Sequence, residues 1–176
     1  MNNPNIHVYC GEGKGKTSAA IGLAVRCAGG GFCVNIVQFL KDGSSGEIAF
    51  INNLNNKNIR AYSFEKTHGF YPFLDNGEKN QVKDEHGQAI EFVKSKIGES
   101  DLIVLDEILG SVENGIVSEQ TLLEIIELCK QNDTELVLTG LNVSDIIKSK
   151  CDYISELKCI SHPYTKGQQQ RKGIEY

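Results

Sequence analysis

The sequence contains no run of Lys or Arg, no C-x-x-C pair and no apolar stretch near the roughly 20 residues that cross a bilayer. Phosphate backbones are usually met by a basic face. The missing basic runs and a net charge of -5 therefore argue against a nucleic-acid partner and favour a small one. Residues 1–10 lack the charged and apolar regions of a secretory signal. These absences predict a cytoplasmic protein with no membrane contact.

Cysteine and histidine are present but not grouped. Most of the cysteines stand in apolar runs, which indicates reduced, mostly buried thiols rather than a disulfide framework or a zinc site. The scattered histidines argue against a His metal cluster. The residues concerned are Cys10, Cys27, Cys33, Cys129, Cys151 and Cys159, with His7, His68, His86 and His162.

The chain of 176 residues alternates strand-length apolar runs with longer helical patterns, as expected of one α/β domain spanning residues 1–176. We expect a three-layer fold with a central, mostly parallel sheet of about six strands. Residues 65–77 show neither the period of 2 expected of a strand nor the period of 3.6 expected of a helix, so we expect a loop with hydrophobic content. The expected strands are 6–10, 33–40, 59–64, 102–105, 135–141 and 152–160, and the expected helices are 16–28, 48–54, 78–98, 118–131 and 142–151.

The stretch "CGEGKGKTS", residues 10–18, follows the first expected strand and opens the first expected helix. Glycines there let backbone N–H groups turn toward phosphates, Lys16 reaches phosphate oxygens, and the Thr17 hydroxyl can ligate Mg²⁺. The pattern G-x-x-x-x-G-K-[ST] would place its first glycine at Cys10, whereas the glycine is Gly11. The stretch therefore predicts a P-loop that is one residue short, although glycines also serve simply to make tight turns.

An acidic pair closes the run "LIVLDE". Asp106 and Glu107 follow a buried strand, where a carboxylate can hold Mg²⁺ directly or through water. Any exposed strand end can be acidic, so the pair alone is a weak signal. Combined with the upstream loop, it predicts a Mg-nucleotide site in a P-loop NTPase-like, RecA-like fold.

Four segments together resemble the ATP:corrinoid adenosyltransferases of the cobalamin pathway. They are "GEGKGKTSAAIGLAVRCAGGG", "VQFLK" with the following "SGE", "LIVLDE", and the tail "HPYTKG" to "KGIEY". The loop is similar to the family's G-[NEDK]-G-K-G-K-[TS], with the same missing residue. The resemblance implies transfer of the 5′-deoxyadenosyl group of ATP to the Co(I) centre of cob(I)alamin or cob(I)yrinic acid a,c-diamide, with release of triphosphate. It also implies a homodimer, and an electron-donating, flavodoxin-like reductase as a partner.

The resemblance implies roles for individual residues. Lys16, Thr17 and Glu107 would be catalytic, and Thr17, Glu107 and Asp106 would hold the metal. Lys41 and Glu47 would face the corrinoid from the loop after the second strand. The ATP-binding set would be Gly11, Glu12, Gly13, Lys14, Gly15, Lys16, Thr17, Ser18 and Arg26, although from the residues alone Arg26 reads as a solvated helix charge.

The aromatic loop departs from the family pattern G-F-x-W, whose aromatic pair closes on the lower face of the corrin. Gly69 and Phe70 are in register, but Pro72 stands at the tryptophan position and Phe73 comes one residue later. The resemblance implies corrinoid contact by Phe70 and by Phe73, while a loop aromatic tucked onto the core is the alternative.

Two further departures concern charge and length. Leu141 replaces the arginine of a family T-G-R strand end, so that contact is either absent or supplied from elsewhere, for example by Arg171 or Lys172. The N-terminal extension of longer members precedes the first strand, and this chain begins almost at that strand.

Two other functions stay open on the residues. A small kinase or ATPase would use the same loop, with Glu107 orienting a water or a hydroxyl. A nucleotide-gated corrinoid carrier would keep the loop and lack turnover. The shortened loop argues against the kinase.

Overall fold

The computed structural model describes residues 3–54, 56–66 and 69–174. Over these residues, six strands form one sheet in the order β3-β2-β4-β5-β1-β6. All neighbouring strands pair in parallel. The strands are β1 Ile6–Cys10, β2 Val34–Gln38, β3 Ile59–Ser63, β4 Leu102–Asp106, β5 Glu135–Thr139 and β6 Tyr153–Glu156.

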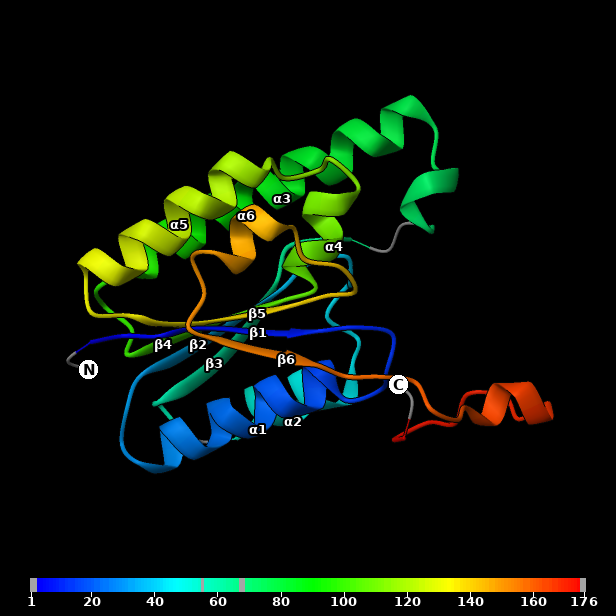
Figure 1. Cartoon of the computed structure of the whole chain (residues 1–176), viewed down its shortest axis with the longest axis horizontal. Helices are drawn as coiled ribbons and strands as arrows, with labels where there is room; N and C mark the ends of the chain where they lie inside the picture. The colour runs from blue at the N-terminus through cyan, green and yellow to red at the C-terminus, as the bar shows by residue number, and fades with distance from the viewer. Residues whose placement is uncertain (1–2, 55, 67–68, 175–176) are drawn as a thin grey trace.

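Helices cover both faces of the sheet and complete three layers (Figure 1). One face carries α1 and α2, and the other carries α3, α4, α5 and α6. Each helical layer shares a buried apolar cluster with the sheet. The helices are α1 Lys16–Gly29, α2 Gly46–Asn53, α3 Asn76–Lys96, α4 Ile108–Glu113, α5 Glu119–Gln131 and α6 Asp145–Lys148. The expected P-loop NTPase-like α/β architecture is confirmed, and the sheet is wholly parallel among the described strands.

Local sequence signals explain where the long helices begin. Asp75 caps α3 by accepting from the Glu78 N–H, while the Glu78 side chain accepts from the Asp75 N–H, which is a capping box. Ser118, the expected cap of α5, accepts from the Thr121 N–H at 3.0 Å. Helix α5 then buries Leu122, Ile125, Ile126 and Cys129 on one stripe.

Several elements differ from the sequence expectations. Helix α4 was not expected, because its six residues are too few to show a helical period. The loop 65–77 contains a short 3-10 turn, η1 Tyr71–Phe73, and the first residues of α3, and the tail contains η2 Pro163–Lys166. Burial of the thiols is less complete than expected: Cys10, Cys27 and Cys129 are buried, whereas Cys33 and Cys159 are exposed. His68 and the last two residues of "KGIEY" lie outside the described residues.

All strands point their carboxyl ends toward one edge of the sheet, where ligands of open α/β sheets usually bind. The order places β5 between β1, which leads into the glycine loop, and β4, which ends at Asp106. The C-terminal segment after β6 returns to the same edge (Figure 1). None of the described helices combines the length and the apolar character that a bilayer crossing requires.

Candidate functional site

The glycine loop turns at Gly11. Strand β1 runs through Cys10, which is buried, and Gly11 then adopts φ 104°, a left-handed value that favours glycine. The Gly11 N–H donates to Leu141 O at 2.8 Å, and the Gly13 N–H donates to Leu157 O at 2.7 Å. A Cβ on Gly13 would lie 2.7 Å from the Leu157 carbonyl. Gly11 and Gly13 therefore fix the loop against the ends of β5 and β6.

Cys10 is a structural residue at this turn. Burial, followed by the charge of Glu156, raises the pKa of its thiol, while Lys148 and Lys16 lower it. A thiol kept protonated in this way is a poor nucleophile. The residue that interrupts the expected glycine pattern is thus the last residue of a strand.

Two lysines of the loop bond to backbone carbonyls. Lys16 Nζ donates to Gly11 O at 2.7 Å and to Gly13 O at 3.2 Å. Lys14 Nζ donates to Ile174 O at 2.8 Å, which ties the C-terminal segment to the loop. Both ammonium groups lie where an anion bound at the start of α1 would meet them.

Asp106 is the centre of a buried polar network. Its side chain has no exposed surface. Oδ1 accepts from Thr17 Oγ1 and from Thr139 Oγ1, each at 2.8 Å. Oδ2 accepts from Lys41 Nζ at 2.8 Å and from Gln38 Nε2 at 3.1 Å. A buried carboxylate needs such partners, and this network links the start of α1 to the ends of β2, β4 and β5.

Glu107 lies beside this network in a left-handed backbone conformation, with φ 62°. Its N–H donates to Thr139 Oγ1 at 2.8 Å, which holds the turn from β4 into α4. Burial, followed by the charge of Asp106, raises the pKa of the Glu107 carboxyl, while Lys41 and Lys16 lower it. A non-glycine residue in this conformation beside a cavity is a candidate for function.

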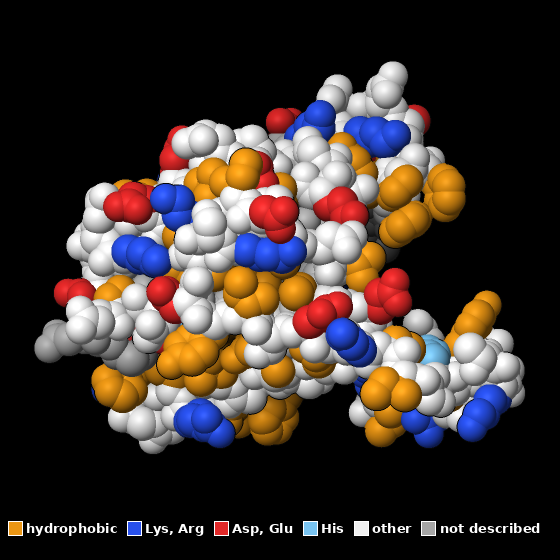
Figure 2. Space-filling model, in the orientation of Figure 1, with side chains coloured by type: hydrophobic (Ala, Val, Ile, Leu, Met, Phe, Trp, Pro, Cys, Tyr) orange, Lys and Arg blue, Asp and Glu red, His pale blue; other side chains and the backbone are white. Residues whose placement is uncertain are grey.

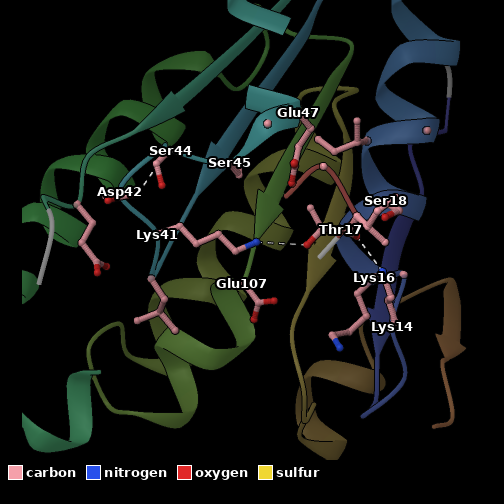
Figure 3. A pocket seen from close by; sticks show the side chains of 18 of the residues that line it. Lys14, Lys16, Thr17, Ser18, Lys41, Asp42, Ser44, Ser45, Glu47 and Glu107 are labelled. Atoms are coloured by element: carbon pink, nitrogen blue, oxygen red, sulfur yellow. Dashed lines mark hydrogen bonds between the residues drawn. The ribbon is translucent and has the colours of Figure 1, made fainter. Parts of the chain in front are cut away.

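A cavity of about 1140 Å³ opens at this edge of the sheet. Its wall is built from the start of α1, the segment after β2, the segment after β3, Glu107 and the C-terminal segment. Figure 3 shows side chains from the loop, from α2 and from the β2 segment pointing into the same space. Figure 2 shows the molecule hollowed at this end, between the start of α3 and the projecting C-terminal segment.

Most of the predicted site residues meet at this cavity. They are Lys14, Gly15, Lys16, Thr17, Ser18, Lys41, Glu47, Phe70 and Glu107. Glu12 is exposed outside its lining, and Asp106 is buried behind Thr17. Lys41 contributes to the wall, and its ammonium points toward Thr17 (Figure 3). The same ammonium donates to the buried Asp106 at 2.8 Å instead of projecting outward as a loop cation.

Arg26 and Phe73 are not brought to this cavity. Arg26 lies ten residues beyond Lys16 on α1, about 15 Å along the axis. It lines a separate cavity of about 240 Å³ with Phe32 and Glu135. Phe73 is 85% exposed, and its ring lies 5.6 Å from the ring of Phe70. The nucleotide contact that the resemblance implies for Arg26 stays a prediction, at a residue outside this cavity.

Sequence reasoning missed several residues of the site. Gln38 and Thr139 end their strands at the Asp106 network, and polar residues closing buried strands were the available signal. A second buried group joins three distant segments: His86 bonds to Glu65 and to Ser111. Glu65 lines the cavity. No sequence signal connects these three residues.

The site contains oxygen and ammonium groups rather than a metal cage. Within the described ranges, no three His, Cys, Asp or Glu side chains are grouped so as to hold a metal ion. The hard oxygen donors on the cavity wall include the Thr17 hydroxyl and the carboxylates of Asp42, Glu47, Glu65 and Glu107. The arrangement can bind an anion at the start of α1 and a large ligand beside it.

Comparison with known proteins identifies the family. The model for ATP:corrinoid adenosyltransferase BtuR/CobO/CobP matches residues 2–176. A corrinoid adenosyltransferase from Pseudomonas aeruginosa is 26% identical over 96% of this chain and 82% of its own length. The corrinoid adenosyltransferase of Escherichia coli K12 is 28% identical, over 97% of this chain and 85% of its own. A relative from Salmonella typhimurium, corrinoid adenosyltransferase CobA, is 29% identical with the same coverage.

One solved structure shows the same fold. It is a KaiC-like protein from Pyrococcus horikoshii, with a TM-score of 0.53 and 14% identity, covering 98% of this chain and 76% of that one. At this level of identity the likeness concerns the fold alone.

Proposed function

Because the chain belongs to the ATP:corrinoid adenosyltransferase family, we propose that it transfers the 5′-deoxyadenosyl group of ATP to the Co(I) centre of a corrinoid. The cobalt electron pair forms the bond to C5′, the bond between C5′ and the triphosphate oxygen breaks, and inorganic triphosphate leaves. The observation that carries this proposal is one cavity that joins the shortened phosphate loop to Phe70. We also propose that residues 1–176 act as one adenosyltransferase domain.

The chain's own residues suit this reaction. Co(I) carries no proton, so the attack needs no general base. The negative charge that develops on the departing triphosphate needs donors, and preorganised donors at such sites are typically worth about 3 kcal/mol each. Lys14, Lys16 and the N–H groups at the start of α1 supply them. Lys16 would exchange its bonds to the Gly11 and Gly13 carbonyls for phosphate oxygens.

The donor set also suits Mg²⁺, which takes oxygen ligands and is usually held by one or two protein groups together with substrate phosphates. Thr17 and Glu107 would hold it, because both line the cavity and both offer oxygen. Mg²⁺ would supply charge neutralisation on the triphosphate. Asp106, fully buried and bonded to the Thr17 hydroxyl at 2.8 Å, would orient that hydroxyl rather than bind the ion directly.

The corrinoid would occupy the part of the cavity beyond the loop. The cavity is larger than the roughly 300–1,000 Å³ of most small-molecule sites, as two large substrates require. Phe70 is 71% exposed on its wall, which leaves the ring free to cover an apolar face of a ligand. Glu47, in the first turn of α2, faces the same space (Figure 3). A homodimer and an electron-donating reductase complete the proposal.

An anaerobic assay tests this function. The protein is mixed with Mg-ATP and chemically reduced corrinoid, and the visible spectrum is followed. We expect a light-sensitive alkylcobalt spectrum. ATP consumption without a cobalt–carbon signal would instead indicate a kinase or an ATPase, and binding of ATP and corrinoid without any product would indicate a carrier.

A further inference from the structure

We infer that Glu65 makes this protein selective for corrinoids whose peripheral side chains are amides over corrinoids with free peripheral carboxylates. The inference rests on the proposed function and specifies the substrate class of the same cavity. It is carried by the position of Glu65 on the cavity wall and by the buried group that fixes it.

Glu65 is held rather than free to swing. Its side chain is only 10% exposed, and its Oε2 lies 2.7 Å from Nε2 of His86, which is 1% exposed. The next residue is anchored too, because the Lys66 N–H donates to Glu85 Oε2 at 3.2 Å on α3. Among the described residues, the hydrogen bond of the Glu65 side chain is made by Oε2, and Oε1 forms none. This segment therefore presents a fixed carboxylate oxygen to a ligand in the cavity.

Both ring nitrogens of His86 are held by groups from distant segments. Its Nδ1 lies 2.8 Å from Ser111 Oγ, its Nε2 lies 2.7 Å from Glu65 Oε2, and the Leu40 N–H donates to Nε2 at 3.5 Å. Ser111 has no exposed surface, so the three residues are not a hydrolytic triad. This buried contact fixes the Glu65 carboxylate on the cavity wall, where a bound ligand meets it.

The other charged side chains on the cavity wall do not cancel the charge of the Glu65 carboxylate. Lys66 and Asp42 also line the cavity, but both are exposed and of opposite sign, and solvent screens exposed charges strongly. The ammonium group of Lys41 is paired with the buried carboxylate of Asp106. Glu47 is half-buried, lines the same cavity and adds to its negative potential. Away from the phosphate loop, the wall is therefore acidic.

A fixed carboxylate on the cavity wall should bind amidated and carboxylated corrinoids with different affinities. A peripheral amide N–H₂ donates a hydrogen bond to the carboxylate, and such charge-assisted bonds change affinity by roughly 10- to 100-fold. A peripheral carboxylate offers no donor and is repelled by the like charge. Glu65 should therefore favour the amidated corrinoid by at least about tenfold.

The test compares dissociation constants of two Co(II) corrinoids under anaerobic Mg-ATP. The probes are cobinamide, with amidated side chains, and cobyrinic acid a,c-diamide, with free carboxylates. Glu65→Gln keeps an acceptor for His86 and removes the charge, and Glu91→Gln is the control, since Glu91 is 75% exposed and pairs with Lys94 on α3. ATP affinity and thermal unfolding report whether each variant is folded.

We expect wild type and Glu91→Gln to bind cobinamide more tightly by at least about tenfold, and Glu65→Gln to reduce that ratio to below about threefold. An unchanged ratio in Glu65→Gln overturns the inference, and a wild-type preference for the carboxylated corrinoid overturns it without any variant. The dissociation constants are measured without turnover. A preference for cobinamide, together with no cobalt–carbon product in the activity assay, would therefore support the inference and reject the proposed transferase function.

Discussion

Lys41→Met should destabilise the protein far more than Lys96→Met, although the two lysines form similar ion pairs. Lys41 and Lys96 both lie 2.8 Å from a carboxylate, and their side chains are 32% and 31% exposed. Asp106, the partner of Lys41, is 0% exposed, whereas Glu99, the partner of Lys96, is 66% exposed. The two pairs differ mainly in whether water can replace the lost cation.

The magnitude follows from that difference. Removing one partner of a buried ion pair costs about 3–5 kcal/mol. The partial exposure of Lys41 and the three remaining donors to Asp106 reduce this to about 2–3 kcal/mol. With a urea m-value of about 2 kcal/mol/M, the unfolding midpoint should fall by about 1 M. Lys96→Met should leave the midpoint unchanged within error.

Equilibrium urea unfolding of wild type and both variants measures the effect. Circular dichroism and an independent probe should give coincident transitions. Equal shifts in Lys41→Met and Lys96→Met would refute the argument that the burial of Asp106 decides the cost.

Three further predictions concern the loop, the acid and the aromatic residue. Gly13→Ala should lose about 1–3 kcal/mol of stability in urea unfolding, because its Cβ would meet the Leu157 backbone. Gly87→Ala, where no atom lies within 4 Å of the new Cβ, should instead gain up to about 1 kcal/mol; losses in both would contradict this. Glu107→Gln should raise the melting temperature at neutral pH, since the raised pKa makes the ionised carboxylate costly in the folded state. The gain should vanish as the pH falls below the ordinary value of 4.5, and a gain independent of pH would count against it. Lys16→Ala should abolish turnover, whereas Phe70→Ala should slow turnover and leave ATP affinity nearly unchanged; equal losses of ATP affinity would show that Phe70 is misplaced.

Much of the fold follows from patterns that the sequence shows directly. Buried parallel strands such as Leu102–Asp106 are continuous apolar runs, and α5 shows a clean apolar stripe after a Ser cap. The order of the strands in the sheet could not be predicted in this way, because it depends on which apolar runs pair with each other. No local pattern indicates that β5 lies between β1 and β4.

The candidate site was predictable where its residues are neighbours in sequence. The loop from Gly11 to Ser18 and the acidic pair Asp106 and Glu107 at the end of β4 lie at the same sheet edge, as expected of parallel strands. The inward turn of Lys41 was not predictable, because it depends on the burial of a carboxylate 65 residues away. The contact between His86 and Glu65 likewise forms only when α3 packs beside β2.

Two residues that the resemblance implies for the site lie outside the cavity lining. Arg26 follows the loop on the same helix, but ten residues carry it about 15 Å from Lys16. The resemblance predicts which residue type stands at position 26, but it does not give the distance of that residue from the cavity in this chain. Phe73, in the η1 turn, does not line the cavity either, although its ring lies 5.6 Å from the ring of Phe70.

The phosphate product of a single turnover tests the central claim most directly. Enzyme is mixed anaerobically with one equivalent of Co(I) corrinoid and Mg-ATP, and phosphorus NMR identifies what is released. The account predicts one inorganic triphosphate for each cobalt–carbon bond. ADP or orthophosphate as the first product, with no cobalt–carbon bond, would contradict it.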